Sequence, residues 1–387
     1  MLAITQGSFG RALAVGMLTV LLAACKVVPE TSRPGPVPTP TPTPGPSENV
    51  LPTDTARHRV ALLVPLSGEN AAVGRSIANA TTMALLDTSA QNLRITTYDT
   101  ATGAGTAAAS AIRDGNKLIL GPLLREDVTP ILAQARPADV PLITFSNDTT
   151  IAAPDVFVMG HVPEQSVART VAYAAAQGAR RFAALVPNGD YDRRAGDALS
   201  QAVGRVGGTL AAIERYDRGN TSIVSAAQRL KAQGGYDAVL LAEGARLSAM
   251  AAAELKEGGA QPMIFGTELW SGEASIAGSA PLRGAWFSAV SDNRYRQFVT
   301  SYESRFGEQP YRLATLGYDA VLLALRVARD WQPGRDFPTG RMLADDGFLG
   351  LDGPFRFRST GVGERAMEVR RIGNGSISVV DPAPERF

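Results

Sequence analysis

The residues that most often do covalent or acid–base chemistry are sparse in this chain of 387 residues. It contains one cysteine, Cys25, and two histidines, His58 and His161. Nucleophilic catalysis usually needs a serine or cysteine beside a histidine that accepts its proton. His58 borders a proline-rich segment and His161 lies at a junction between two similar halves, so neither is well placed for such a pair. No histidines and cysteines have the spacing of metal ligands. We therefore expect no enzymatic activity, no metal and no cofactor.

One glycine-rich stretch has the pattern of a nucleotide-binding loop. Residues 103–108 fit Gly-x-Gly-x-x-Ala and lie between a predicted strand and a predicted helix. A dinucleotide site also needs an acidic residue at the end of the next strand, where it holds the ribose. The next strand, 118–120, is followed by Gly121 and Pro122 instead. We interpret the stretch as a flexible loop before a helix.

Two neighbouring carboxylates can also catalyse hydrolysis as an acid and a base, but the acidic residues of this chain are dispersed along the sequence. The acids that folding could bring together are Asp99, Asp148, Asp190, Glu268 and the pair Asp345–Asp346. Nothing in their spacing specifically supports a hydrolase. Asp148, Glu164 and Asp190 each lie near a predicted helix start, where acidic side chains usually cap the helix.

The single cysteine follows a distinctive segment. Arg11 precedes an apolar run, residues 12–24, which ends in Leu-Ala-Ala directly before Cys25. The run is too short to span a bilayer, which favours a signal-peptide core over a transmembrane helix. Leu-Ala-Ala-Cys resembles a lipobox, in which the cysteine is lipidated and becomes the mature N-terminus. The alternative is an ordinary secretory signal with an incidental cysteine. We expect a signal peptide at 1–24, lipid on Cys25, and no membrane contact other than this anchor.

A spacer follows the cysteine. From Pro34 to Pro46 every second residue is proline, which favours polyproline II over helix or paired strand. At about 3.1 Å per residue, the segment from Lys26 to Arg57 could extend up to about 100 Å. A docking motif for another domain is the alternative interpretation. We expect residues 25–57 to be a linker that lifts a folded domain off a membrane.

The elements that would position a site begin near His58. Residues 60–64 form a short apolar run, typical of a strand buried on both faces. Strand and helix then alternate without a hairpin signal, which implies right-handed crossovers and a parallel sheet. The predicted strands of this half are 60–64, 93–98, 118–120 and 141–145, and the predicted helices are 71–87, 106–113 and 128–135.

The pattern restarts after residue 160. The second half has predicted helices at 164–177, 193–206, 222–233 and 247–256, and predicted strands at 182–186, 210–216, 238–241 and 263–265. A run at 285–290 leads into helices 295–306 and 313–331, and the segments 355–358, 367–372 and 376–380 look like short antiparallel strands. We expect an α/β fold of two doubly wound parallel-sheet lobes joined by a hinge. Residues 58–160 plus 290–330 would form lobe 1, and residues 161–289 plus 331–387 would form lobe 2. Strand ends of two such lobes meet at a crevice, where small-molecule sites are common.

Composition agrees with a globular protein that has a sizeable core. Hydrophobic residues make up 45% of the chain and charged residues 19%, and the formal net charge is +1. Neither nucleic-acid binding nor disorder is indicated by so balanced a charge. A single cysteine excludes an internal disulfide.

Several stretches resemble the leucine/isoleucine/valine-binding, or type I periplasmic binding protein, family. Its opening is matched by residues 60–68, 74–80 and 83–87, and its next strands by 118–122 and 140–148. Residues 156–160 resemble the crossing between lobes, and 316–320 the late helix that returns to the first lobe. The similarity extends over about 59–385. It implies a ligand-binding protein that works by stabilising one lobe arrangement, without a covalent step.

The resemblance also implies ligand contacts in the crevice loops. The candidate ligand-binding residues are Arg125, Ser146, Asn147, Asp148, Tyr191 and Glu268. Tyr191 matches an aromatic residue that closes over the ligand from the second lobe. Glu268 matches an acid that meets the ammonium group of the ligand.

Two loops depart from the amino-acid binders of this family. Those proteins hold the ligand carboxylate with small hydroxyl side chains and backbone amides, whereas this chain has Arg125 and Glu126 in the first loop. In the second loop, Asp148 would repel a carboxylate unless Arg125 neutralised it. Arg125 could itself bind an anionic ligand, but we favour an ion pair with Glu126 or Asp127.

The lipobox, the spacer and the Ser-Asn-Asp loop together resemble the penicillin-binding-protein-activator branch. This resemblance implies a regulator that contacts a cell-wall synthase and is concentrated near the membrane by its tether. It predicts a crevice poorly shaped for a small ligand and an exposed docking patch. Lys26 stands where an aspartate often retains lipoproteins at the inner membrane, so the outer membrane is favoured in a cell with two membranes.

The alternative function is a solute receptor. Such a receptor would hand an amino-acid-like or peptide ligand to the permease of an ABC importer. It predicts hinge closure on binding and a polar pocket that joins Ser146, Asn147, Tyr191 and Glu268. No nucleic-acid partner is expected under either hypothesis.

Overall fold

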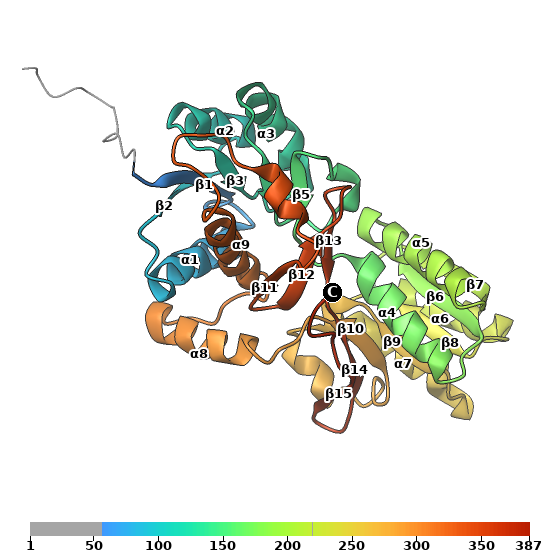
Figure 1. Ribbon diagram of the computed structural model, residues 1–387. Helices are drawn as coiled ribbons and strands as arrows, with labels where there is room; N and C mark the ends of the chain where they lie inside the picture. The colour runs from blue at the N-terminus through green and yellow to red at the C-terminus, as the bar shows by residue number, and fades with distance from the viewer. Residues whose placement is uncertain (1–55, 219) are drawn as a thin grey trace, which may run out of the picture. The chain divides into compact units, whose positions relative to one another are not determined.

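A computed structural model describes residues 56–218 and 220–387. The predicted signal peptide, Cys25 and the proline-rich spacer lie outside these residues. Within them, no helix is both long enough and apolar enough to cross a membrane. Figure 1 shows the order of the elements along the chain.

A five-stranded parallel sheet forms the centre of the first lobe, with strand order β2-β1-β3-β4-β5. Its strands are β1 (His58–Val64), β2 (Leu93–Asp99), β3 (Leu118–Leu120), β4 (Leu142–Thr144) and β5 (Val156–Val158). Its helices are α1 (Ala71–Asp87), α2 (Ala104–Arg113), α3 (Val128–Ala135) and α9 (Ala314–Val327).

The apolar run in β1 is buried on both faces, as its sequence predicts. Val60, Leu62 and Val64 pack in one core with residues of α1 and α9. Ala61 and Leu63 alternate with them and pack in the opposite core with residues of α2 and α3. Helices therefore cover both faces of the sheet, as in doubly wound folds.

A seven-stranded sheet forms the second lobe, with strand order β15-β14-β10-β9-β8-β6-β7. Its strands are β6 (Arg181–Pro187), β7 (Thr209–Tyr216), β8 (Ala238–Leu241), β9 (Met263–Gly266), β10 (Trp286–Ala289), β14 (Glu368–Ile372) and β15 (Ile377–Asp381). The strands from β6 to β10 pair in parallel, whereas β14 and β15 are antiparallel additions at one edge. The pairs α4 (Pro163–Ala176) with α5 (Asp190–Arg205) and α6 (Asn220–Gln233) with α7 (Ala245–Lys256) cover opposite faces. The expected α/β fold with two parallel-sheet lobes is confirmed.

The segment after α9 packs differently from the expectation. It forms a separate antiparallel sheet of β11 (Phe348–Gly350), β12 (Gly353–Phe357) and β13 (Gly363–Arg365). Trp331, Phe348 and Phe355 are buried in the same core as β1 and α9. Burial of these aromatic side chains places the segment from about 331 to 365 with the first lobe, whereas we assigned 331–387 to the second. Only β14 and β15 join the second sheet.

The chain therefore crosses between the lobes three times. The first crossing, 159–162, follows β5, the second, 290–294, follows β10, and the third, 366–367, joins β13 to β14. After the second crossing, α8 (Tyr295–Phe306) packs on α1 through Phe298 and Tyr302. Short 3-10 helices occupy Arg125–Asp127, Arg136–Ala138, Thr149–Ile151, Glu257–Gly259, Glu268–Trp270, Ala274–Gly278 and Thr339–Leu343.

Candidate functional site

The crevice loops follow the carboxyl ends of β3, β4, β6 and β9. Carboxyl ends of parallel strands gather at one edge of a sheet, so the loops of the two lobes face each other. Asn147 and Glu268, which come from different lobes, line one cavity. Arg125 of the first lobe lies 3.0 Å from Asp190 of the second.

In the loop after β4, the side chains are engaged with their own backbone. The amide of Asp148 donates a hydrogen bond to Ser146 Oγ at 3.2 Å. Asp148 Oδ1 accepts hydrogen bonds from Thr150, from its amide at 2.9 Å and from its hydroxyl at 2.6 Å. Asp148 thus caps the 3-10 helix Thr149–Ile151, which confirms its predicted capping role.

Arg125 has different partners from those expected. Its guanidinium Nε lies 3.0 Å from Asp148 Oδ2, and its Nη1 lies 3.0 Å from Asp190 Oδ2 across the crevice. The predicted pairing with Glu126 or Asp127 is wrong, because the side chain extends towards a buried acid that needs a counter-charge. Burial alone would raise the pKa of Asp148, but the hydrogen bonds from Thr150 and the charges of Arg194 and Arg125 hold it below its ordinary value.

Arg194 makes a second bridge across the crevice. It lies on α5 in the second lobe, and its Nη1 donates to the carbonyl oxygen of Asn147 at 2.5 Å. The same nitrogen lies 3.7 Å from Asp148 Oδ1 and 3.6 Å from Glu164 Oε1. Sequence reasoning missed this residue, because the reach of its side chain across the crevice depends on the fold. Arg194 adjoins the buried stripe of α5 that includes Ala195 and Ala198, whereas its neighbour Arg193 is exposed.

Tyr191 and Glu268 contact each other within the second lobe. The hydroxyl of Tyr191 lies 2.8 Å from Glu268 Oε1 and 2.8 Å from Thr267 Oγ1. Burial raises the pKa of Glu268 to about 7, and the hydrogen bond from Tyr191 partly opposes this rise. Burial and the nearby charge of Glu268 raise the pKa of Tyr191 well above its ordinary value, so its hydroxyl stays protonated.

A cavity of about 240 Å³ lies between these loops and the hinge. Its lining residues are Asn147, His161, Glu268, Leu269, Ser271, Ala289, Val290, Arg312, Leu313 and Met367. Its size lies below the 300–1,000 Å³ or so of common ligand sites. Of the candidate residues, Asn147 and Glu268 both line this cavity. Arg125 and Asp148 contact each other and are not among its lining residues.

Several buried polar atoms of residues that line this cavity have no hydrogen-bond partner in the described part of the chain. They are Glu268 Oε2, Ser271 Oγ, and Nε and Nη2 of Arg312. Arg312 and Ser271 had no sequence signal, because each lies in an irregular segment without a periodic pattern.

In residues 56–218 and 220–387, no group of histidine, cysteine and acidic side chains is arranged to hold a metal ion.

A sequence model described as "Periplasmic binding protein" matches residues 58–376. The chain belongs to the periplasmic binding protein family. This match confirms the resemblance noted in the sequence, and it covers both lobes and all three crossings.

Solved structures share the fold at low sequence identity. A putative branched-chain amino acid ABC transporter protein from Rhodospirillum rubrum has a TM-score of 0.75 and is 20% identical, covering 84% of this chain and 100% of that one. The C-domain of LpoA from Haemophilus influenzae, described as a regulator of PBP1A, has a TM-score of 0.65 and is 20% identical. It covers 83% of this chain and 99% of that domain. Both likenesses establish the fold of a binding protein and leave its partner open.

A curated relative adds no function. The uncharacterized protein RP748 of Rickettsia prowazekii is 27% identical over 173 residues. The match covers 44% of this chain and 46% of the relative, so this chain matches about half of that protein.

Proposed function

We propose that this protein is a non-enzymatic regulator of the cell envelope that acts on peptidoglycan synthesis by docking on a cell-wall synthase. The observation that carries the proposal is the crevice, which Arg125 and Arg194 bridge from opposite sides. In a solute receptor, the ligand supplies the contacts that favour the closed arrangement of the lobes. Here the chain's own side chains supply such contacts, and the cavity lined by Asn147 and Glu268 measures about 240 Å³.

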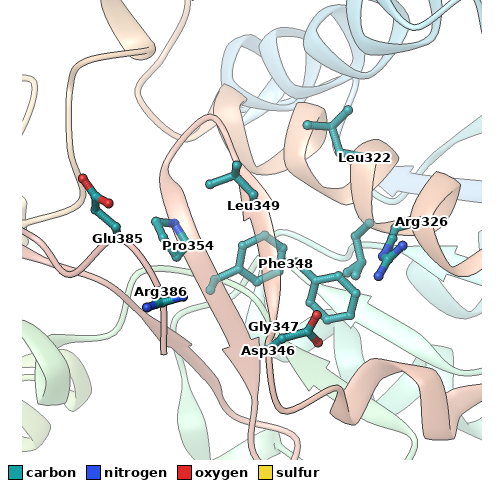
Figure 2. Close-up of a pocket in the computed structure, with 11 residues that line it drawn as sticks. Leu322, Arg326, Asp346, Gly347, Phe348, Leu349, Pro354, Glu385 and Arg386 are labelled. Carbon is teal, nitrogen blue, oxygen red and sulfur yellow. The ribbon is translucent and has the colours of Figure 1, made fainter.

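An exposed leucine and the hollow that it lines form a candidate contact surface for a protein partner. Leu349 on β11 is 57% exposed, although it lies in a sheet that is otherwise packed on the first lobe. Leu349 lines a hollow of about 370 Å³, together with Phe348 and Phe355. Figure 2 shows Phe348 next to Leu349 in this hollow. Arg326 and Asp346 stand at its rim. An apolar hollow with a polar rim is the arrangement that accepts an anchoring side chain at protein interfaces.

The proposed location follows from the N-terminal segment. Lipid on Cys25 would anchor the protein to a membrane, with its folded part in the periplasm. Lys26 favours the outer membrane in a cell with two membranes. The proline-rich spacer would let the folded part reach a synthase while keeping its effective concentration high. The likeness to the Haemophilus influenzae LpoA C-domain, described as a regulator of PBP1A, supports a synthase as the partner.

Cross-linking in cells tests this proposal. A photoreactive amino acid at Leu349 in the full chain should cross-link to a cell-wall synthase, identified by mass spectrometry. Leu86 is the matched control, because it is 62% exposed on a different element, α1. Cross-links to the synthase from Leu349 and not from Leu86 would support the proposal. Cross-links from Leu349 to an importer permease would refute it.

One observation favours the alternative, a receptor that delivers an amino-acid-like ligand to an ABC importer. Glu268 and Ser271 line the cavity, and Glu268 Oε2 and Ser271 Oγ have no hydrogen-bond partner among the described residues, so both are acceptors that a ligand ammonium group would satisfy. Thermal unfolding with amino acids, small peptides and muropeptides tests it. A ligand at 100 times its dissociation constant stabilises a protein by about 2.7 kcal/mol. A shift that Glu268→Gln abolishes would favour the receptor.

The fragment Leu51–Phe387 suits these measurements. It contains every described element and the entire family match. The LpoA C-domain, which aligns over 99% of its length, is a solved structure without the rest of its chain, so we expect a fragment of this extent to fold on its own.

A further inference from the structure

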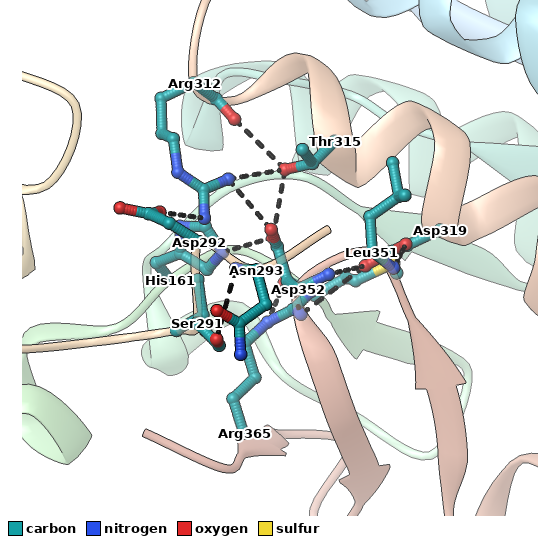
Figure 3. Close-up of polar contacts among 12 residues, drawn as sticks. His161, Ser291, Asp292, Asn293, Arg312, Thr315, Asp319, Leu351, Asp352 and Arg365 are labelled. Atoms are coloured by element: carbon teal, nitrogen blue, oxygen red, sulfur yellow. Dashed lines mark hydrogen bonds and ion pairs between the residues drawn. The ribbon is translucent and has the colours of Figure 1, made fainter. Parts of the chain in front are cut away.

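A buried ionic cluster lies where the three crossings between the lobes pass each other (Figure 3). Its members are His161, Asp292, Arg312, Thr315, Asp319, Asp352, Arg365 and Arg370. The side chains of Arg312, Arg365 and Arg370 are only 12%, 3% and 5% exposed. Charges this deeply buried must be paired, so their contacts fix the segments that carry them.

Asp352 joins the first crossing to the segment that leads into α9. It lies in the turn between β11 and β12 and is fully buried. Its carboxylate is 2.9 Å from His161 Nε2 in the first crossing and accepts a hydrogen bond from Arg312 Nη1 at 2.8 Å. Thr315 Oγ1 donates to it at 2.9 Å. Burial opposes ionisation of Asp352, but Arg312, His161 and Arg365 hold its pKa far below the ordinary value, so it remains charged.

Arg365 joins the first crossing to the third. It ends β13, and its Nη2 donates to the carbonyl oxygen of Met159 in the first crossing at 2.9 Å. Its Nη1 lies 3.8 Å from both Asp319 and Asp352. Its backbone amide donates to the side chain of Gln165, on α4 of the second lobe, at 2.9 Å.

Arg370 joins the third crossing to the second. It lies on β14, and its Nη2 donates to the carbonyl oxygen of Val290 at 2.6 Å. Its Nη1 is 2.5 Å from Asp292 Oδ2, and its Nε is 2.8 Å from Glu368 Oε1. Asp292 Oδ1 in turn lies 3.7 Å from Arg312 Nη2, which links the second crossing back to Asp352.

We propose that Arg312, Arg365 and Arg370 brace the hinge and hold the two lobes at one angle. Each arginine contacts acids or carbonyl groups of a different pair of segments, so rotation of the lobes would pull buried charges from their partners. The protein then presents its surfaces as one rigid unit and does not open and close as a clamshell. This inference goes beyond the proposed docking function, because the brace would fix the lobe angle whichever partner binds.

The lobe-to-lobe distance in solution tests the brace. The fragment Leu51–Phe387 lacks cysteine, so Gln134→Cys on α3 and Ala232→Cys on α6 give two unique sites for spin labels. Pulsed electron–electron double resonance then reports the distribution of distances between the two spin labels, one on each lobe. We expect one narrow peak in the otherwise wild-type fragment.

Variants test whether the brace sets the lobe angle. Arg365→Gln should broaden or split the distribution, because it removes the contact with Met159. Arg193→Gln is the control, because it removes only exposed ion pairs with Asp190 and Asp197 on the same helix. This control should keep the narrow peak. Two peaks in the wild-type fragment would overturn the brace even if Arg365→Gln does not fold, as would an unchanged peak in folded Arg365→Gln. The measurement contains no synthase, so its outcome is independent of the docking proposal.

Discussion

Replacing Glu268 by glutamine should remove a pH dependence from the stability of the protein. Burial raises the pKa of Glu268 from 4.5 to about 7 in the folded chain. In the unfolded chain the group is exposed and its pKa returns to the ordinary value. Between these two values the folded chain keeps a proton that the unfolded chain has lost. The stability from this group is therefore complete below pH 4.5 and is lost as the pH rises through 7.

The size of the effect follows from the shift. One pKa unit corresponds to about 1.4 kcal/mol, so the shift of Glu268 is worth about 3 kcal/mol. Glutamine keeps the shape of the side chain and an acceptor for the Tyr191 hydroxyl, and it does not titrate. The free energy of unfolding of Glu268→Gln, relative to wild type, should therefore rise by about 3 kcal/mol between pH 4.5 and 8.

Urea unfolding at several pH values measures this difference. Asp192, whose pKa burial raises to about 6, titrates in both proteins, so only the difference between them isolates Glu268. Glu308→Gln is the control, because it makes the same chemical change at an exposed position. A difference between Glu268→Gln and wild type that stays flat from pH 4.5 to 8 would refute the reasoning, since the cavity would then be open to water.

Two pairs of substitutions test the crevice bridge made by Arg194 and the packing of the second lobe. Arg194→Met should lower the free energy of unfolding by about 3–5 kcal/mol, because it leaves Asp148 buried without one of its counter-charges. Arg193→Met, which removes only exposed pairs, should change it by less than about 1 kcal/mol. Equal losses in urea unfolding would contradict this. Gly266→Ala should destabilise the end of β9, because a Cβ there would overlap the Trp270 ring. Gly204→Ala, on α5 with open space around it, should stabilise by about 0.4–1 kcal/mol in the same assay. A destabilised Gly204→Ala or an unaffected Gly266→Ala would count against the packing described.

The alternation of strands and helices was predictable because each element carries its own periodic pattern. The run at 60–64 became a strand buried on both faces, and the helix expected at 71–87 has those bounds. The segment from 331 to 365 was assigned to the wrong lobe. Its strands are short and antiparallel, and their alternation does not indicate which core their aromatic side chains enter.

The candidate site could be predicted only where backbone topology determines it. Asn147 and Glu268 line one cavity because both follow carboxyl ends of parallel strands. The partners of Arg125 and the bridge made by Arg194 depend on where long side chains reach in three dimensions. Sequence spacing contains no such information, so neighbouring acids were chosen for Arg125 and Arg194 was overlooked. The ligand-binding roles of the six candidates remain predictions.

The activity of a purified cell-wall synthase from the same bacterium, with and without the full chain, tests whether this protein regulates a synthase by docking on it. The rate of glycan polymerisation or peptide cross-linking should change when the wild-type chain is added. It should stay near the basal rate with Leu349→Glu, whereas Leu86→Glu, an equally exposed site, should act as wild type does. An identical rate with and without the wild-type chain would contradict a regulator that docks on a synthase.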